Sequence, residues 1–489
     1  MKINESNSNL PPLSLSEKDM RAIMGSVGNM IVDHFVNLPH HPVTRPSTVA
    51  GLRQGLAGPP PVEPTPVAEL LSQIQNYVMA EMTHNDHPRN FAFVPGPSNF
   101  VSVMADALAS AFNIFCGAWI GPSGTAQVEL ITIDWLRQLF GFPETAGGLF
   151  VSGGSMANLT GLAVARQVKL GSEVAGGRIY FSDQTHSSVA KGLRILGFQA
   201  DQLHKLASDA NYCLPMTALK QAVASDRKAG HKPFCVVANA GTTNSGAVDP
   251  LNEIADFCSN EGFWLHVDGA YGGSAALSAS GAKLLEGMDR ADSLSIDPHK
   301  WMFQPYEIGC ALIRDQNALR ETFKVSAEYL KIVEESAEQP NFSDYGVQLT
   351  RGFRALKLWM SLKAFGVEAF RSAIERGIAN ALRAEKILRA QTCWEIVTPA
   401  QLGIVTFRFI APGFDEAWLN KLNSDIATDM ITSGFALLSP TVMRGQTVLR
   451  MCTINPRTTD DDIGETIKKL ENIAHQQIAL SKLLHPSEY

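Results

Sequence analysis

Short apolar runs alternate with stretches of helical periodicity through the middle of the chain. The apolar runs predict strands at 148–151, 178–181, 234–239, 263–267, 293–296 and 310–313. Apolar residues three and four positions apart predict helices between most of them, as at 155–169, 187–197 and 252–260. This alternation is typical of an α/β fold with a mostly parallel central sheet and helices on both faces, which binds ligands at the carboxyl ends of its strands.

The patterns on either side of this core are different. Residues 14–37 have helical spacing, with Ser14 or Ser16 available as an N-cap, and a proline-rich stretch around 59–66 follows. We expect an N-terminal helical arm over 1–85, which packs on a partner subunit in preference to its own domain. A large ligand-binding domain is predicted over 86–366. A long helical pattern after Tyr345 leads into a smaller C-terminal α+β domain over 367–489.

Composition narrows the class of protein. The 489 residues include 41 basic and 48 acidic ones, and the net charge of −7 gives no indication of binding to nucleic acid or an anionic membrane. Seven dispersed cysteines indicate reduced thiols, and the polar start has no apolar core for a secretory signal. The longest apolar region, 101–120, is interrupted by polar residues, which predicts a buried helix beside a polar pocket. We therefore expect a soluble, cytoplasmic protein.

A lysine and an aspartate at two strand ends are the first candidates for chemistry. Lys300 follows an apolar run, and a lysine buried there must be paired, neutral or chemically engaged. Asp268 ends the preceding predicted strand; a purely structural carboxylate is the alternative for it. One lysine that forms an imine and one buried aspartate that holds a pyridinium proton are what pyridoxal 5′-phosphate (PLP) requires.

Other strand ends carry small or polar motifs. The Ser-Gly-Gly-Ser turn at 152–155 lets backbone N–H groups approach an anion at a helix N-terminus. His186 follows the next strand and could lie over a cofactor ring, and Thr242 and Thr243 close another strand. Each motif alone also fits an ordinary turn or helix cap. Together they supply the parts of a PLP site at one sheet edge, whereas the Gly-x-Gly-x-x-Gly of a nicotinamide site is absent here.

Three motifs resemble those of a known family. Residues 183–188 (Asp-Gln-Thr-His-Ser-Ser), 266–271 (His-Val-Asp-Gly-Ala-Tyr) and 297–301 (Asp-Pro-His-Lys-Trp) resemble the group II PLP-dependent amino-acid decarboxylases. Over about 15–475 the chain is most like the aromatic-L-amino-acid decarboxylases. The resemblance implies a fold-type I enzyme, similar to aspartate aminotransferase, which forms a homodimer with shared active sites. It also implies decarboxylation of an L-amino acid to the amine and CO2 through a Schiff base on Lys300 and a quinonoid intermediate.

The resemblance implies roles for individual residues. Lys300, Asp268, His186 and Tyr329 would be catalytic, with Tyr329 on a mobile loop returning a proton to Cα. A tyrosine packed at a helix end is the alternative for Tyr329. Asp297 stands where asparagine is frequent, and a carboxylate near a phosphate is repulsive unless it is protonated or turned away. The residues implied to bind PLP are Gly154, Ser155, His186, Thr243, Asp268, Ala270, Asp297, His299 and Lys300.

The implied substrate pocket is aromatic and small. It comprises Phe93, Val94, Gly96, Phe115, Gly117, Trp119 and, from across the dimer, Thr350. The stretches 91–96 and 115–119 contain no basic residue, which disfavours acidic substrates, although Arg89 lies just outside. Gly96 and Gly117 enlarge the pocket relative to the animal enzymes, whereas Thr350 shrinks one corner. We expect tyrosine, DOPA, phenylalanine or tryptophan as the substrate, and predict no metal.

Three other functions stay open at this point. An aromatic aldehyde synthase would couple decarboxylation to oxidative deamination, but such relatives tend to replace the tyrosine or the histidine that this chain keeps at Tyr329 and His186. A decarboxylase for a small or diamino acid, such as 2,4-diaminobutyrate, is the second. A non-catalytic PLP-fold binding protein is the third, and the retained Lys300 and Asp268 argue against it.

Overall fold

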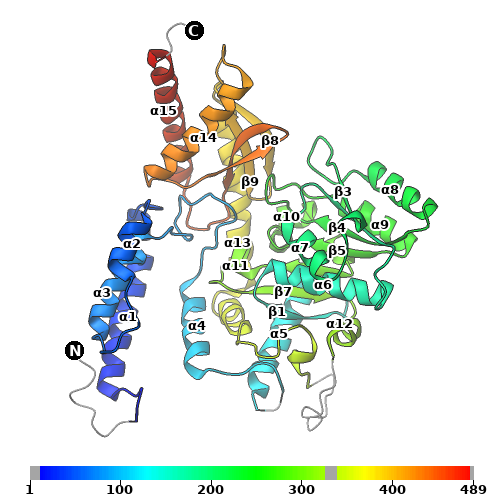
Figure 1. The fold of residues 1–489 in the computed structure, drawn as a ribbon, viewed down its shortest axis with the longest axis horizontal. Helices are drawn as coiled ribbons and strands as arrows, with labels where there is room; N and C mark the ends of the chain where they lie inside the picture. Colours follow the sequence, from blue (N-terminus) through cyan, green and yellow to red (C-terminus); the bar gives the residue numbers. More distant parts are fainter. Residues whose placement is uncertain (1–10, 120, 325–338, 485–489) are drawn as a thin grey trace.

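A seven-stranded sheet forms the centre of the chain in a computed structural model that describes residues 11–119, 121–324 and 339–484 (Figure 1). The strand order is β1-β7-β6-β5-β4-β2-β3, and all neighbours are parallel except that β7 is antiparallel to both β1 and β6. The predicted mostly parallel sheet is therefore confirmed. Its strands are β1 (Gly147–Val151), β2 (Gly177–Ser182), β3 (Leu203–Leu206), β4 (Lys232–Asn239), β5 (Trp264–Asp268), β6 (Ser293–Ile296) and β7 (Gly309–Ile313).

The strands that the sequence pattern predicts are the ones whose residues are mostly buried. All residues of β1, β2, β5, β6 and β7 are buried, so these strands are rich in apolar residues on both faces of the sheet. The polar residues within β5 and β6, such as His266 and Ser293, are hydrogen-bonded. The edge strand β3 contains no fully buried residue and was not predicted.

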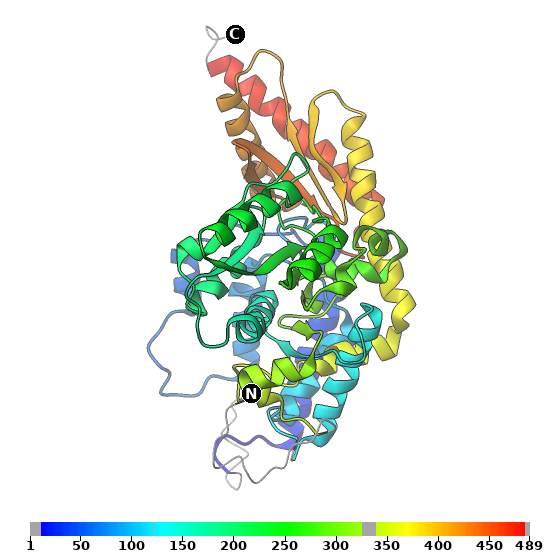
Figure 2. The same cartoon turned by 90° about the vertical axis from the view of Figure 1, so that its right-hand side faces the viewer.

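Helices cover both faces of this sheet (Figure 2). Helix α6 packs on β5, β6 and β7, while α9 packs on β4 and β5. The helices of this domain are α4 (Phe100–Phe112), α5 (Ser123–Leu139), α6 (Gly154–Leu170), α7 (Ser187–Ile195), α8 (Met216–Lys228), α9 (Leu251–Glu261), α10 (Ala279–Leu284), α11 (Pro298–Trp301) and α12 (Gln316–Phe323). Short 3₁₀ helices lie at η3 (Ala200–Gln202), η4 (Gly273–Leu277), η5 (Met288–Arg290) and η7 (Phe342–Asp344).

The long helix α13 (Ala355–Arg389) joins the large domain to the C-terminal domain. Gly366 has φ 72° and ψ 159°, a conformation that favours glycine and that kinks the helix into two segments. The first segment packs on α4 and α5, and the second packs on the C-terminal sheet.

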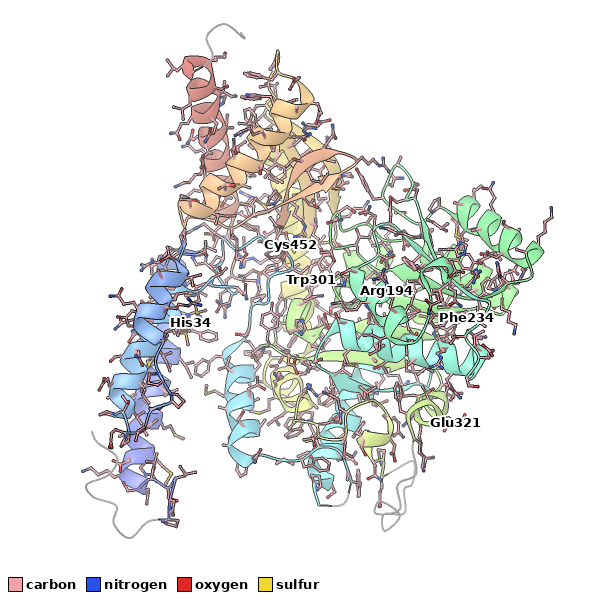
Figure 3. The ribbon with its side chains drawn as sticks, in the orientation of Figure 1. His34, Arg194, Phe234, Trp301, Glu321 and Cys452 are labelled. Carbon is pink, nitrogen blue, oxygen red and sulfur yellow. The ribbon has the colours of Figure 1, made fainter. Side chains whose placement is uncertain are left out.

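The C-terminal domain has a four-stranded antiparallel sheet of its own, in the order β10-β11-β9-β8. It also has a separate core, which includes Phe407, Phe409 and, from before α4, Phe91. Trp301 and Cys452 lie where the two domains meet (Figure 3). Its elements are β8 (Trp394–Gln401), β9 (Ile404–Phe409), α14 (Glu416–Thr432), β10 (Ser439–Met443), β11 (Gln446–Cys452) and α15 (Asp460–Leu484).

The N-terminal arm lies along one side of the molecule (Figure 1). Ser16 accepts a hydrogen bond from the backbone N–H of Asp19 and caps the first helix, as one of the two predicted caps. Many apolar side chains of the arm are exposed, among them Met20, Met24 and Val36. The arm consists of α1 (Glu17–Asn37), η1 (Leu38–His40), α2 (Val49–Leu56), α3 (Val67–Tyr77) and η2 (Met79–Glu81).

The predicted buried helix over 101–120 is wrong in length and in environment. Helix α4 ends at Phe112, because Asn113 takes a left-handed conformation with φ 46°. Only Ser102 and Ala105 of this helix are buried, while Leu108 and Phe112 are exposed within the subunit. Among the described residues, none of the helices combines the length and apolarity needed to cross a membrane.

A buried ion pair ties α5 to the segment before α13. Arg351 Nη2 lies 2.5 Å from Glu129 Oε1, Arg351 Nη1 lies 3.1 Å from Glu129 Oε2, and both side chains are 1% exposed. Arg351 also donates to the carbonyl oxygens of Phe150 and Cys116, and Glu129 accepts the N–H of Phe150. The pair thus holds α5, β1 and the segment before α13 together.

Replacing Arg351 with methionine should leave Glu129 as an unpaired buried charge and lower the free energy of unfolding by about 3–5 kcal/mol. Denaturant unfolding followed by circular dichroism measures this change. The matched control is Arg21→Met, which breaks an ion pair to Glu17 whose side chains are 78% and 75% exposed. The control should change stability by less than about 1 kcal/mol. Equal effects of the two substitutions would contradict a structural role for the buried pair.

Candidate active site

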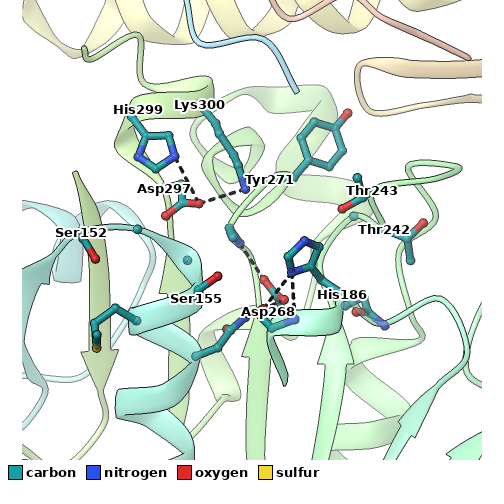
Figure 4. A pocket seen from close by; sticks show the side chains of 18 of the residues that line it. Ser152, Ser155, His186, Thr242, Thr243, Asp268, Tyr271, Asp297, His299 and Lys300 are labelled. Carbon is teal, nitrogen blue, oxygen red and sulfur yellow. Dashed lines mark hydrogen bonds and ion pairs between the residues drawn. The ribbon is translucent and has the colours of Figure 1, made fainter. Parts of the chain in front are cut away.

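A cavity of about 360 Å³ lies at the carboxyl ends of the central strands (Figure 4). Residues that follow β1, β2, β4, β5 and β6 line it, because these strands point the same way and end at one edge of the sheet. Every residue of the predicted PLP-binding set lines this cavity: Gly154, Ser155, His186, Thr243, Asp268, Ala270, Asp297, His299 and Lys300. The sequence motifs therefore do meet in one place.

The turn at Gly153–Gly154 forms one wall of the cavity. A Cβ atom on Gly154 would lie 2.8 Å from both Ala270 Cβ and Asp297 Oδ2, and one on Gly153 would lie 3.1 Å from His299 Cε1. Only glycine allows this close approach between the start of α6 and the ends of β5 and β6. The first N–H groups of a helix have no intrahelical partner, so the start of α6 fits a phosphate group.

Asp268 is held in place by three hydrogen-bond donors. Its Oδ2 accepts from Asn158 Nδ2 at 2.9 Å, and its Oδ1 accepts from the Ala270 N–H at 3.1 Å and from Ser295 Oγ at 3.2 Å. These donors stabilise a negative charge and fix the orientation of the carboxylate at the cavity floor.

A chain of hydrogen bonds supports Asp268 from behind. His266 Nε2 lies 2.9 Å from Asn158 Oδ1, and His266 Nδ1 lies 2.8 Å from Ser293 Oγ. Burial lowers the pKa of His266 to about 4, although Asp268 acts in the opposite direction, so the ring is neutral at pH 7. Because an amide oxygen only accepts, Nε2 carries the proton, and Nδ1 accepts from Ser293. Trp264 Nε1 donates to the same serine. The donors therefore run in one direction, from Trp264 to Ser293, His266, Asn158 and finally Asp268.

His186 lies at the start of α7 and lines the cavity from the end of β2. Its Nδ1 accepts from the backbone N–H of Ser188 at 3.2 Å and lies 2.8 Å from Ser188 Oγ. Ser188 Oγ in turn lies 3.0 Å from Asn158 Nδ2. His186 and Asp268 are therefore positioned by the same asparagine.

Lys300 is paired with a carboxylate, Asp297. Its Nζ lies 2.9 Å from Asp297 Oδ2, and the Lys300 and Asp297 side chains are 25% and 2% exposed. Burial alone would lower the pKa of Lys300, but the charge and hydrogen bond of Asp297, together with Asp268, raise it above its ordinary value. Burial lowers the pKa of the neighbouring His299, whose Nε2 is 3.6 Å from Asp297 Oδ2. The lysine that faces the cavity is thus a charged ammonium at neutral pH.

The predicted substrate residues are not among the residues that line this cavity within one subunit. Gly96 lies close to one of the residues that line the cavity, since a Cβ atom on it would be 3.0 Å from the carbonyl oxygen of His299 and 2.6 Å from Tyr306 Oη. A Cβ atom on Gly117 would overlap the carbonyl of Leu349. The set Phe93, Val94, Gly96, Phe115, Gly117, Trp119 and Thr350 stays a prediction. Tyr329 lies outside the described residues.

Sequence reasoning missed Asn158 and Tyr306. Asn158 lies four residues after Gly154, which is about one turn along α6. Since residues four apart share a helix face, this spacing indicates that Asn158 lies on the same side of α6 as Gly154. Tyr306 has no such signal. It lies between α11 and β7, and its ring is 4.9 Å from that of His299.

Comparison with known proteins agrees with this geometry. Residues 52–410 match the family model for the pyridoxal-dependent decarboxylase conserved domain. An aromatic-L-amino-acid decarboxylase of Bacillus atrophaeus is 47% identical over 466 residues, which cover 95% of this chain and 97% of that protein. A phenylacetaldehyde synthase of Arabidopsis thaliana is 30% identical, with 94% and 95% covered. The crystal structure of Oryza sativa TDC with PLP and tryptamine matches with a TM-score of 0.90 at 29% identity, covering 96% of this chain and 99% of that one.

The chain belongs to the family of pyridoxal-dependent decarboxylases. Its family, its fold-type I architecture and its full-length relatives make it a PLP-dependent carboxy-lyase that acts on an amino acid.

Replacing Asn158 with alanine should weaken PLP binding about tenfold, because Asp268 loses one donor and the buried N–H of His266 loses its acceptor. Titration of the PLP-free protein, followed by quenching of tryptophan fluorescence, measures the dissociation constant. Asn211→Ala is the control, since Asn211 is exposed and outside the cavity. If both variants bind PLP equally well, Asp268 is oriented without this chain of hydrogen bonds.

Proposed function

We propose that this enzyme decarboxylates an aromatic L-amino acid to the corresponding amine and CO2. The main support for an aromatic substrate is the 47% identity to an aromatic-L-amino-acid decarboxylase over almost the whole of both chains. The absence of a basic residue from 91–96 and 115–119 supports it, because a substrate carboxylate buried there would have no partner within those stretches.

In this proposal, different cavity residues bind different parts of the cofactor. Bound PLP supplies an aldehyde that condenses with an amino group and a ring that accepts the electron pair left when CO2 departs. The start of α6, with Gly154 and Ser155, binds the phosphate. Asp268 keeps a proton on the pyridine nitrogen, and Lys300 supplies the protein's amino group.

The remaining residues of the proposal control the substrate side. His186 covers one face of the ring and excludes water from it. Tyr329 returns a proton to Cα after CO2 has left, and this distinguishes the proposal from an aldehyde synthase. The 30% identity to the phenylacetaldehyde synthase of Arabidopsis thaliana supports aldehyde synthesis as the second candidate function.

We also infer that the enzyme is a homodimer in which the arm packs on the partner. The support is that the arm and α4 expose several large apolar side chains, namely Met20, Met24, Val36, Leu108 and Phe112. A cavity of about 940 Å³ lies beside the arm and is lined partly by Val27, Ile31 and Ile74. A second copy would cover these surfaces and bring Thr350 to the partner's site. A cytoplasmic location agrees with seven cysteines that form no disulfide.

Purified enzyme with PLP should release CO2 from at least one of L-tryptophan, L-tyrosine, L-DOPA and L-phenylalanine and form the matching amine in equal amount. Lys300→Ala should reduce this rate at least about a hundredfold, because it removes a group that contacts the reacting atoms. It should also abolish the visible absorption band of the PLP-bound protein. Labelled CO2, amine chromatography and absorption spectra measure these outcomes.

The matched control is Lys283→Ala, at an exposed lysine outside the cavity, which should keep both the band and the activity. Aldehyde formed with stoichiometric oxygen uptake would replace the proposed reaction with that of an aldehyde synthase. Faster CO2 release from an acidic or diamino acid would overturn the aromatic substrate class.

Sedimentation equilibrium should give twice the chain mass of 53.0 kDa. The double substitution Met20→Glu/Met24→Glu should weaken the dimer at least tenfold, since each buried methionine side chain contributes about 1.5–3 kcal/mol. Lys18→Gln on the same helix is exposed and polar and serves as the control. A wild-type protein that sediments as a monomer would refute the proposed dimer.

A further inference from the structure

Asp297 is the most enclosed charged group of the cavity. Its side chain is 2% exposed, and its Oδ2 contacts Lys300 Nζ at 2.9 Å. Its Oδ1 is buried and accepts no hydrogen bond from the described residues. A buried carboxylate oxygen without a donor is costly, so this side chain has hydrogen-bonding capacity that the protein itself does not use.

The carboxylate lies directly against the proposed phosphate site. A Cβ atom on Gly154 would be 2.8 Å from Asp297 Oδ2, and a Cβ atom on Gly153 would be 3.9 Å from Oδ1. The same glycine turn begins α6, where an anion is favoured. A phosphate bound at this helix start and an ionised Asp297 would therefore be adjacent anions in a poorly solvated space, and they would repel each other.

The surrounding charges do not remove this conflict. His299 contacts Asp297, but burial disfavours its protonated form. Asp268 also lines the cavity and adds negative charge, whereas Glu307, a further lining residue, is paired with Arg354 at 2.9 Å. Tyr306 lies beside His299 and is uncharged at neutral pH, because burial raises its pKa. Lys300 is the cation that compensates Asp297, and its amino group is the one that condenses with the aldehyde of PLP.

We propose that Asp297 changes its protonation state when PLP binds: it is the ionised partner of Lys300 beforehand and a neutral carboxyl group that donates a hydrogen bond to the phosphate afterwards. The proposal rests on the roles given above to Lys300 and to the start of α6. Lys300 itself is one source of the proton. The Nζ–H bond breaks, an O–H bond forms on Asp297, and both groups become neutral, which is the state of the amine that adds to an aldehyde.

Aspartate at this position does what asparagine cannot. The amide of an asparagine is a permanent donor to a phosphate, but it cannot hold Lys300 as an ion pair or take up its proton. Asp297→Asn therefore separates the two roles with almost no change of shape. The resemblance to enzymes that often carry asparagine here indicates that the substitution is compatible with the fold.

Infrared difference spectra of the wild-type enzyme, with PLP minus without PLP, test the protonation directly. A band of a protonated carboxyl group should appear on PLP binding and should be missing in Asp297→Asn. Asp292→Asn is the control because Asp292 does not line the cavity, and its spectrum should keep the band. If the wild type and Asp297→Asn give the same difference spectrum in this region, the proposal is wrong.

The pH dependence of PLP affinity gives a second test without catalysis. In a Lys300→Ala background no ammonium can compensate Asp297. At every pH at which Asp297 is ionised in the PLP-free variant, one proton should therefore bind together with PLP. The affinity should then fall by about tenfold per pH unit as the pH rises, beyond any dependence that PLP itself contributes. The double variant Lys300→Ala/Asp297→Asn should lack this extra slope and bind PLP at least tenfold more tightly at alkaline pH. Equal slopes in the two proteins would overturn the proposal.

Separate results would refute the proposed role of Lys300 and the proposed protonation of Asp297. If Lys300→Ala keeps the absorption band of the wild-type enzyme, the proposed role of Lys300 fails. If that band is lost but the carboxyl band and the two slopes do not depend on Asp297, only the inference about Asp297 fails.

Discussion

The cost of burying charge is the constraint on which this site depends. Four charged side chains line the same cavity, and none of them is left without a partner. Glu307 lies 2.9 Å from Arg354 Nη2. Asp268 is held by three neutral donors, whereas Lys300 and Asp297 compensate each other at 2.9 Å. Removing either member of that pair leaves the other charge without its partner, so these positions are coupled before any cofactor is considered.

The sheet explains why these groups meet. Residues far apart in the chain come together because β1, β2, β4, β5 and β6 end at one edge, and the glycine turn before α6 lets that edge close tightly. Asn158 then links two of the strand ends, since it bonds to Asp268 at the end of β5 and, through Ser188, to His186 after β2. A displacement of α6 would therefore disturb the phosphate site and both of these side chains together.

Sequence patterns predict the parts of the molecule that are determined locally. Buried parallel strands are rich in apolar residues, and the motifs at their ends place Lys300, Asp268 and His186 at one edge. The pattern did not predict β3, because an edge strand with no fully buried residue has little apolar signal. It also overestimated the burial of α4, since apolar composition cannot distinguish a helix in the core from one that exposes apolar side chains on the surface of the subunit. The spacing from Gly154 places Asn158 one helical turn along α6, but its partners Asp268 and His266 are more than a hundred residues away, and no local pattern encodes those contacts. Tyr306 has no such spacing signal.

The C-terminal domain completes the support of the cavity from outside it. Trp301, the residue after Lys300, stacks on Tyr271 with ring centroids 5.5 Å apart and an angle of 4° between the planes. Tyr271 follows Asp268 by three residues, and its hydroxyl accepts the N–H of Gly403 in the C-terminal domain at 3.0 Å. The ring of Trp301 also closely approaches Gly377 and Gly403. The Trp301–Tyr271 stack therefore joins the segment that carries Lys300 to the segment that carries Asp268, and both rings contact the second domain. A shift of that domain would displace Lys300 and Asp268 together.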